Sequence, residues 1–254
     1  MLLAIDVGNT HTVFGVYDGD QLRHHWRLES ERRRTVDEYG VLLRMLFAGA
    51  GRPMIDGIAV SSVVPPATQV IEAWARTYLG LTPLIVGPGV RTGMPILYDD
   101  PQQVGGDRVV NAVAAFERTR DATIVVDCGT ATKFEYITRQ GEYVGGIIAP
   151  GLGIAGDALF ERAARLYRVE LTCPPRVLGR NTVHAVQSGL IYGYVSLVDG
   201  LVVRMRQEIG TTARVIATGG FATLLAPQSE TIEQVDEFLT LDGLRLIYAR
   251  NSGQ

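Results

Sequence analysis

Three short runs rich in apolar residues open the chain, at residues 2–7, 12–17 and 22–28. Turn-forming residues separate them, and Asp18-Gly19 is typical of a tight hairpin turn. The pattern therefore predicts a meander of three strands. A second run of the same kind begins at "ATIVVDCGTATKFEYI", turns near Gln140-Gly141 and ends in "YVGGIIA". It predicts a second meander in the other half of the chain.

Helical spacing of apolar residues follows each meander. Thr35 and Glu38 form a capping-box pattern ahead of the first such stretch. The remaining elements of the first half are predicted as a strand at 58–64, a helix from Pro65-Pro66 to about 79, a strand at 83–86 and a helix from about Asp107 to Thr119. Those of the second half are helices at 153–166 and 181–209, a strand at 213–217 and a closing helix.

The two halves form an approximate internal repeat, because Asp6 and Asp127 stand at equivalent points of the two meanders. The alternation of strands and helices predicts an α/β fold with a mixed sheet in each half, divided as residues 1–120 and 121–254. If the halves face each other, the two Asp-Gly turns lie on opposite sides of one cleft. Their small residues would let backbone N–H groups approach phosphate oxygens.

Each Asp-Gly turn also has a purely structural interpretation. A strand-end Asp followed by Gly8, Asn9 and Thr10 is typical of an Asx turn, and a single copy would favour that explanation. Two copies in equivalent places favour function instead. A carboxylate in such a turn can hold Mg²⁺, directly or through water, while amides and threonine hydroxyls contact the phosphates of a nucleotide.

Composition narrows the class of protein. The chain has 254 residues, 46% hydrophobic and 20% charged, which is enough to bury a large core. A formal net charge of −3 gives no electrostatic footprint for nucleic acid. No leader sequence or membrane span is expected, which predicts a cytoplasmic protein. Cys128 and Cys173 are expected to be reduced, and the four histidines lack zinc-ligand spacing.

A third segment, "YDDPQQVGGDRVVNAVAAFE", places Gly105-Gly106 just before a predicted helix. Asp107 could simply be an acid favoured by the dipole at the helix N-terminus. Alternatively, the Asp107 carboxylate accepts the proton of a hydroxyl and the Arg108 guanidinium binds an anion. Combined with a phosphate-binding cleft, the second interpretation predicts a kinase.

Seven motifs in order, "DVGNT", "YDDP", "GGDRVVNA", "DCGTAT", "GGIIAPG", "GRNTVHAVQSGLIYGY" and "ATGG", cover nearly the whole chain. In these motifs the sequence resembles type III pantothenate kinases, members of the acetate and sugar kinase, Hsc70 and actin superfamily. The resemblance implies two similar ribonuclease H-like halves. It also implies ATP-dependent phosphorylation of pantothenate to 4′-phosphopantothenate, the first step of coenzyme A biosynthesis, by a homodimer that needs Mg²⁺ and K⁺ or NH₄⁺.

The resemblance implies a role for each matching residue. Asp107 is expected to be the base on the substrate hydroxyl, Asp6 to lie near Mg²⁺, and Asp127 to hold the monovalent cation. The residues expected to bind ATP are Asp6, Val7, Gly8, Asn9, Thr10, His11, Thr12, Val13 and Thr130. Those expected to bind pantothenate are Tyr98, Gly105, Gly106, Asp107, Arg108 and, across the dimer interface, Thr182.

Several alternatives stay open at this level. Thr182 could be an ordinary helix-capping hydroxyl, and Gly219-Gly220 a plain start of a helix. The apolar positions of the 181–209 helix indicate either core or a dimer seam; they are Val183, Val186, Leu190, Tyr194, Leu197, Leu201 and Met205. A non-catalytic regulator or another small-molecule kinase could share the fold, although the three retained carboxylates favour an enzyme.

Three positions depart from the usual family pattern. His11 replaces Asn, Gly106 replaces Ala, and Lys133 replaces Thr. Lys133 places a cation where phosphate and potassium are expected. Strand alternation allows it either to face solvent or to reach the region of Asp127 and do the work of the monovalent cation.

Overall fold

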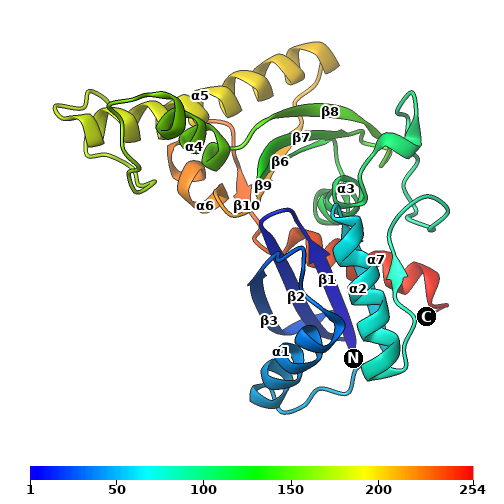
Figure 1. Ribbon diagram of the computed structural model, residues 1–254. Helices are drawn as coiled ribbons and strands as arrows, with labels where there is room; N and C mark the ends of the chain where they lie inside the picture. The colour runs from blue at the N-terminus through cyan, green and yellow to red at the C-terminus, as the bar shows by residue number, and fades with distance from the viewer. Residues whose placement is uncertain (254) are drawn as a thin grey trace. The chain divides into compact units, whose positions relative to one another are not determined.

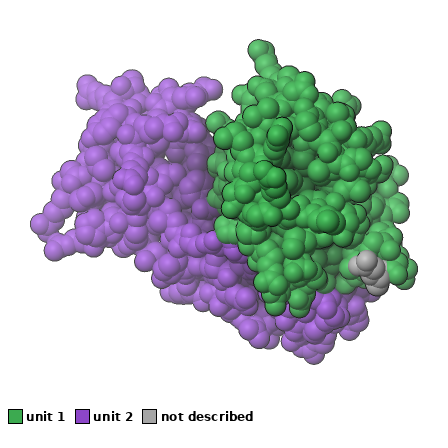
Figure 2. Space-filling view, turned by 90° about the horizontal axis from the view of Figure 1, so that it is seen from below, with its two compact units in different colours: residues 1–94, 98–114, 239–254 green, residues 95–97, 115–238 purple. Residues whose placement is uncertain are grey.

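The computed structural model describes residues 1–253 (Figure 1). The chain forms two compact units, coloured separately in Figure 2. Unit 1 contains residues 1–94, 98–114 and 239–254, and unit 2 contains residues 95–97 and 115–238. Each unit is built around one five-stranded mixed sheet.

The sheet of unit 1 has the strand order β3-β2-β1-β4-β5. Its strands are β1 (Leu2–Val7), β2 (His11–Asp18), β3 (Gln21–Glu29), β4 (Gly57–Ser62) and β5 (Leu84–Ile85). The first three strands are antiparallel neighbours, whereas β4 runs parallel to both β1 and β5. The predicted meander is confirmed, including the hairpin turn, where Gly19 adopts a φ of 61°.

The helices of unit 1 are three that begin within about one residue of their predicted starts and the closing helix, for which the sequence pattern gave no bounds. They are α1 (Val36–Gly49), α2 (Pro65–Trp74) with a π-helical turn (Ala75–Leu79), α3 (Gly106–Thr119), whose last residues belong to unit 2, and α7 (Leu239–Asn251). The capping box is confirmed, since the Glu38 N–H donates to Thr35 Oγ1 at 3.3 Å and the Thr35 N–H donates to Glu38 Oε2 at 2.6 Å. Side chains of β1, β2, β4, α1 and α2 form the core of this unit.

Unit 2 repeats the topology of unit 1. Its strands are β6 (Thr123–Cys128), β7 (Ala131–Ile137), β8 (Tyr143–Pro150), β9 (Arg214–Thr218) and β10 (Gln234–Val235), in the order β10-β9-β6-β7-β8. As in unit 1, the central strand pairs antiparallel with the next strand along the chain and parallel with the strand on its other side. Asp6 and Asp127 are the fifth residues of β1 and β6, so the predicted repeat is confirmed.

The helices of unit 2 are α4 (Leu152–Arg162), α5 (Thr182–Ile209) and the short α6 (Ala222–Leu225), which continues into a 3₁₀ turn (Ala226–Gln228). Figure 1 shows α4 and α5 side by side. The predicted helix at 153–166 is thus shorter than expected, while the long helix is confirmed. The sequence pattern did not predict β10, and it indicated α6 only through the alternative of a helix start at Gly219-Gly220.

Helix α5 supplies much of the core of unit 2. Val186, Leu190, Tyr194 and Met205 are buried there, and Val183, Leu197 and Leu201 pack against the same cluster. Within residues 1–253, α5 is the one helix long and apolar enough to cross a membrane by length and composition, but half of its most apolar window is buried inside the protein. A core helix passes the same test, so this finding is weak support for a membrane span.

The compact units differ from the predicted division at residue 120. Helix α7, at the end of the chain, packs against β1 and β4 and so belongs to unit 1. Two close approaches show that α7 packs tightly against β4 and also against α3. A Cβ at Gly57 would lie 2.1 Å from the Tyr248 hydroxyl oxygen, and a Cβ at Gly243 would lie 2.1 Å from the Val110 carbonyl oxygen.

Candidate active site

The turn between β1 and β2 presents polar groups at the end of the central strand of unit 1. Asp6 lies opposite Val13 of β2 and Ser61 of β4, and it is partly buried. The Gly8 N–H donates to the His11 carbonyl at 3.0 Å, which closes the turn. Asn9, Thr10 and His11 are exposed. These three residues are therefore the part of the turn that an anionic ligand near Asp6 would contact.

Two of the predicted ATP-binding residues lie deeper than this turn. Thr12 is fully buried, and its hydroxyl lies 2.8 Å from Ser30 Oγ. Val13 follows it on β2 and is partly buried. Thr132, at the equivalent place in unit 2, is also buried. The hydroxyl of Thr12 thus holds the hairpin, and its predicted contact with ATP stays a prediction.

The second group of candidates lies at the start of α3. The Arg108 N–H donates to the Gly105 carbonyl at 3.1 Å, so the chain enters the helix through the two glycines. A Cβ at Gly105 would lie 2.6 Å from Asp107 Oδ1, and a Cβ at Gly106 would lie 2.7 Å from the Val86 carbonyl oxygen. Gly105 therefore leaves room for the Asp107 carboxylate over the turn, and Gly106 lets the turn approach the Val86 backbone.

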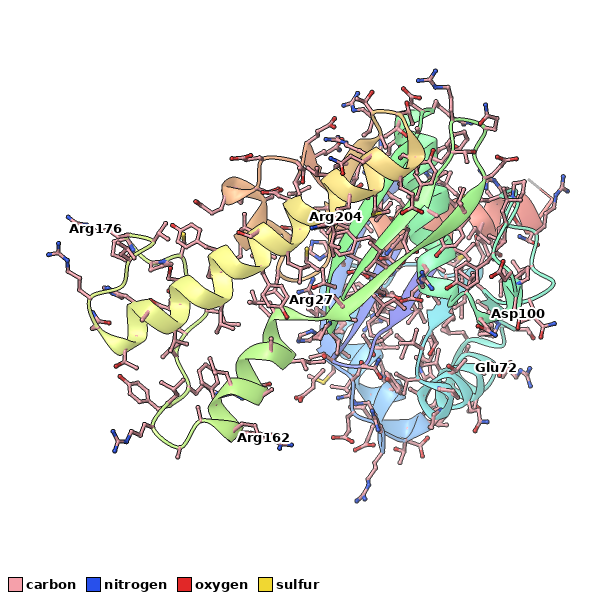
Figure 3. All side chains as sticks on the ribbon, turned by 90° about the horizontal axis from the view of Figure 1, so that it is seen from above. Arg27, Glu72, Asp100, Arg162, Arg176 and Arg204 are labelled. Atoms are coloured by element: carbon pink, nitrogen blue, oxygen red, sulfur yellow. The ribbon has the colours of Figure 1, made fainter. Side chains whose placement is uncertain are left out.

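Arg108 lies beside Tyr98. Its guanidinium carbon is 5.8 Å from the centre of the Tyr98 ring, and the residue is only 6% exposed. Asp100 lies in the loop between them (Figure 3). Its Oδ1 accepts a hydrogen bond from the Gln102 N–H at 3.1 Å. Within unit 1 the structure thus brings together an aromatic ring, a guanidinium and the Asp107 helix start.

The third group surrounds Asp127 in unit 2. Its Oδ2 lies 2.9 Å from Lys133 Nζ, and the two side chains are 15% and 16% exposed. Its Oδ1 lies against Gly219, where a Cβ would be 2.6 Å from that oxygen. Thr130 is exposed at the tip of the turn. Lys133 therefore reaches Asp127, and the alternative of a lysine facing solvent is wrong.

Gly219 lies beside Asp127, although the sequence pattern also allowed Gly219-Gly220 to be a plain start of a helix. It has a φ of 89°, and a Cβ there would also lie 2.7 Å from the Cys128 carbonyl carbon. The Phe221 N–H donates to the Cys128 carbonyl at 3.0 Å. Because β9 runs parallel to β6, the "ATGG" motif reaches the same sheet edge as Asp127. That shared edge is the signal that could have identified it.

The start of α5 corrects the capping interpretation of Thr182. The N-cap is Asn181, whose Oδ1 accepts from the His184 N–H at 2.9 Å. Thr182 is the first helical residue and is exposed. It lines an open groove of unit 2 together with apolar residues of α4 and α5, among them Leu159 and Leu190. Thr182 is therefore not the N-cap of α5, and it lines this groove.

The carboxylates of the described chain suit a metal held jointly with a nucleotide. Among residues 1–253, no group of three or more His, Cys, Asp and Glu side chains lies close enough to hold a metal ion. Mg²⁺ commonly binds through one or two carboxylates together with water and substrate phosphates. Asp6, partly buried beside an exposed turn, fits that kind of site.

Comparison with known proteins identifies the family. The sequence profile of the family described as type III pantothenate kinase matches residues 2–204. The chain belongs to this family. Curated type III pantothenate kinases from Myxococcus xanthus (strain DK1622) and Anaeromyxobacter sp. (strain Fw109-5) are 56% and 57% identical to it over 253 residues. These alignments cover 99% of this chain and 99% and 100% of the two relatives.

Solved structures with low sequence identity agree with the fold of this kinase family. Component A of the (R)-2-hydroxyglutaryl-CoA dehydratase of Acidaminococcus fermentans has a TM-score of 0.61 at 12% identity, with 100% of this chain and 99% of that chain covered. The inorganic polyphosphate/ATP-glucomannokinase of Arthrobacter sp. strain KM has a TM-score of 0.51 at 16% identity, with 98% of each chain covered. The expected superfamily fold, with two similar halves, is confirmed.

Proposed function

We propose that this chain transfers the γ-phosphoryl group of ATP to the primary hydroxyl of pantothenate, forming 4′-phosphopantothenate and ADP at the start of coenzyme A biosynthesis. The observation that carries the proposal is the match to curated type III pantothenate kinases at more than half identity over 99% of the chain. The function is that of a metabolic enzyme, for which a cytoplasmic location is expected.

The residues at the start of α3 are assigned to pantothenate. The Asp107 carboxylate accepts the proton of the substrate hydroxyl while the hydroxyl oxygen attacks the γ-phosphorus of ATP. The bond between the γ-phosphorus and the bridging oxygen of the ADP leaving group breaks. Arg108, supported by Tyr98, binds the pantothenate carboxylate through its guanidinium. Gly105 and Gly106 supply the close turn that this geometry needs. Thr182 completes the pocket of a partner subunit.

The two Asp-Gly turns are assigned to ATP. The resemblance implies that residues 6–13 and Thr130 contact the phosphates through backbone N–H and hydroxyl donors, and that Asp6 holds Mg²⁺ directly or through water. When bound, Mg²⁺ neutralises part of the charge that develops on the transferred phosphoryl group. The resemblance also implies K⁺ or NH₄⁺ at Asp127. A cation there would have to share the carboxylate with the Lys133 ammonium.

The assignment of Thr182 to a partner subunit draws support from the exposed face of α5. Gly189, Gly193, Ser196 and Gly200 are exposed along one side of the helix, and a Cβ at any of these three glycines would meet no atom within 4 Å. A face of small residues lets a second helix approach closely. Arg204, labelled in Figure 3, lies on α5 beyond this set of small residues, toward the C-terminal end of the helix. We therefore assign this face to a homodimer interface.

The test of the function is ADP release measured with and without pantothenate in the presence of Mg²⁺, with the product identified by mass spectrometry. The expected result is turnover that depends on pantothenate and yields a product one phosphate heavier. Turnover with a different alcohol but none with pantothenate would indicate another small-molecule kinase. Nucleotide binding without any turnover would indicate a regulator on the same fold.

A further inference from the structure

Lys133 is the only lysine in the sequence. Every other permanently charged basic side chain is an arginine, including all those in the exposed ion pairs of units 1 and 2. An arginine guanidinium is a broad planar fork, whereas a lysine ammonium is a compact point charge. The single lysine of the sequence is therefore the residue that pairs with Asp127, whereas all other permanently charged basic side chains are arginines.

The ion pair that Lys133 makes is held by the sheet. Lys133 of β7 lies directly opposite Asp127 of β6, and the side chains meet at 2.9 Å with little exposure to solvent. On the other side of the carboxylate, Oδ1 lies against Gly219 and Gly129. Each carboxylate oxygen thus has a close neighbour. A bound K⁺ would need room beside the same carboxylate and would lie close to a like charge.

The fold itself does not require this lysine. In unit 1 the residue opposite Asp6 is Val13, although strand order, pairing and the place of the aspartate are the same. The turn of unit 1 is closed by Gly8 and His11, and that of unit 2 by Gly129 and Ala131, through equivalent backbone hydrogen bonds. Lys133 is thus not needed to form the second turn. It lies on β7 in contact with the carboxylate that the resemblance assigns to a cation.

We propose that the Lys133 ammonium takes the place of the monovalent cation at Asp127, so that phosphoryl transfer by this chain does not depend on K⁺ or NH₄⁺. The residues present do not fit an added cation at this carboxylate, because a covalently attached ammonium already neutralises it. The inference rests on the proposed kinase function. An NH₄⁺ ion and a lysine ammonium carry the same charge and donate the same kind of hydrogen bond.

The first test is a titration of K⁺ at constant ionic strength, with a bulky organic cation as the replacement salt. Wild type is expected to keep its kcat throughout. Lys133→Thr is expected to lose about 10²-fold in kcat without K⁺, as on removal of one electrostatic stabiliser, and to recover when K⁺ or NH₄⁺ is added. Lys133→Met, which removes the charge but keeps the bulk, is expected to lose activity without recovery.

Arg139→Thr is the matched control. It removes an exposed ion pair with Asp121 at the opposite end of the same strand pair, where Arg139 Nε lies 2.7 Å from Asp121 Oδ1. It is expected to keep the wild-type response to K⁺. Equal, strong activation of wild type and Lys133→Thr by K⁺ would overturn the proposal. So would full activity of Lys133→Thr without any small monovalent cation.

A second measurement does not depend on turnover. If removal of the ammonium opens a cation site, K⁺ should raise the melting temperature of Lys133→Thr relative to the organic cation, because a ligand that binds only the folded state stabilises it. Wild type and Lys133→Met should show no such difference. A K⁺-dependent rise in wild type would contradict the proposal even if the chain proved to phosphorylate another substrate.

Discussion

At the scale of single residues, Asp107 carries the sharpest prediction. Asp107→Asn keeps the shape of the side chain but removes the proton acceptor, so kcat with pantothenate should fall by about 10²- to 10⁴-fold while KM changes much less. Asp100→Asn is the control, because Asp100 is an exposed carboxylate of the preceding loop that caps a 3₁₀ turn. A near-normal kcat for Asp107→Asn would assign the base elsewhere.

Cys128 gives a second prediction at this scale. Burial and, to a lesser extent, the neighbouring Asp127 charge raise the pKa of its thiol to about 12. At pH 8 roughly one Cys128 thiol in 10⁴ is therefore a thiolate, the form that reacts. Ellman's reagent should titrate one thiol rapidly in the folded protein, the exposed Cys173, and a second only in denaturant. Cys173→Ser should abolish the rapid phase; two equally rapid thiols would contradict the assignment.

Residue types and spacing led to the prediction of a site at Asp107. They could not decide whether the Lys133 side chain faces solvent or Asp127. Alternation along a strand gives two faces, and only the register selects one. That register follows from the short turn after Cys128, which sets Asp127 opposite Lys133. The role of Gly219 was hidden for a similar reason, because its contact with Asp127 depends on the parallel pairing of β6 and β9.

At the scale of elements, Asp199 of α5 fixes the segment that leads into β10. Its Oδ1 accepts hydrogen bonds from the hydroxyls of Ser229 and Thr231 at 2.5 and 2.7 Å, and its Oδ2 accepts from the Glu230 N–H at 3.0 Å. Burial alone would raise the pKa of Asp199, but these hydrogen bonds outweigh it and lower the pKa. The charged carboxylate is therefore the form that stabilises unit 2.

Asp199→Asn should consequently lower the free energy of unfolding by about 1.5–3 kcal/mol at pH 7, the range for hydrogen bonds to a charged group. Because the folded pKa is lowered, the stabilising contribution is present above the unfolded pKa of about 3.9 and is lost as pH falls through the folded value. The free energy of unfolding should be measured with denaturant at pH 7 and at a series of lower pH values. The difference between Asp199→Asn and wild type should become smaller as the pH falls. Asp157→Asn, at an exposed pair with Arg168, should change stability little.

The elements that the pattern predicted best were long or carried a specific end signal. The Thr35 capping box marked the start of α1, and the helix predicted at 181–209 begins one residue later, at Thr182. The elements it missed are short. Strand β10 has only two residues, Gln234 and Val235, and takes its place by pairing with β9. Periodicity needs more residues than that to distinguish a strand from a loop.

At the scale of the whole molecule, the repeat was visible in the sequence but the partition of the chain was not. Two copies of one strand order follow from two similar patterns. Helix α7, in contrast, belongs to unit 1, which also contains the first residues of the chain, and it packs on β1 and β4. A division drawn along the sequence assigns this helix to the second half, because linear order carries no information about which sheet a terminal helix covers.

The last prediction joins the molecule to its partner copy. Asp107→Asn removes the proposed base, and Thr182→Arg places a bulky cation at the exposed first residue of α5, so each variant alone should be inactive. If Thr182 serves the pocket of the partner subunit, a mixed dimer has one pocket with both changes and one with neither. Equal amounts of the two variants should then recover about one quarter of wild-type activity after subunit exchange, since half of the dimers are mixed and each has one intact site.

Exchange is verified by mixing differently tagged subunits and isolating dimers that carry both tags. A mixture of Asp107→Asn with the double variant Asp107→Asn, Thr182→Arg is the control, since no pairing of these chains can contain an intact site. If each pocket were built within one chain, both pockets of a mixed dimer would carry one change, and activity would not return. Absence of activity after verified exchange would therefore show that Thr182 does not contribute to the partner's pocket. The assignment of Asp107 would be unaffected.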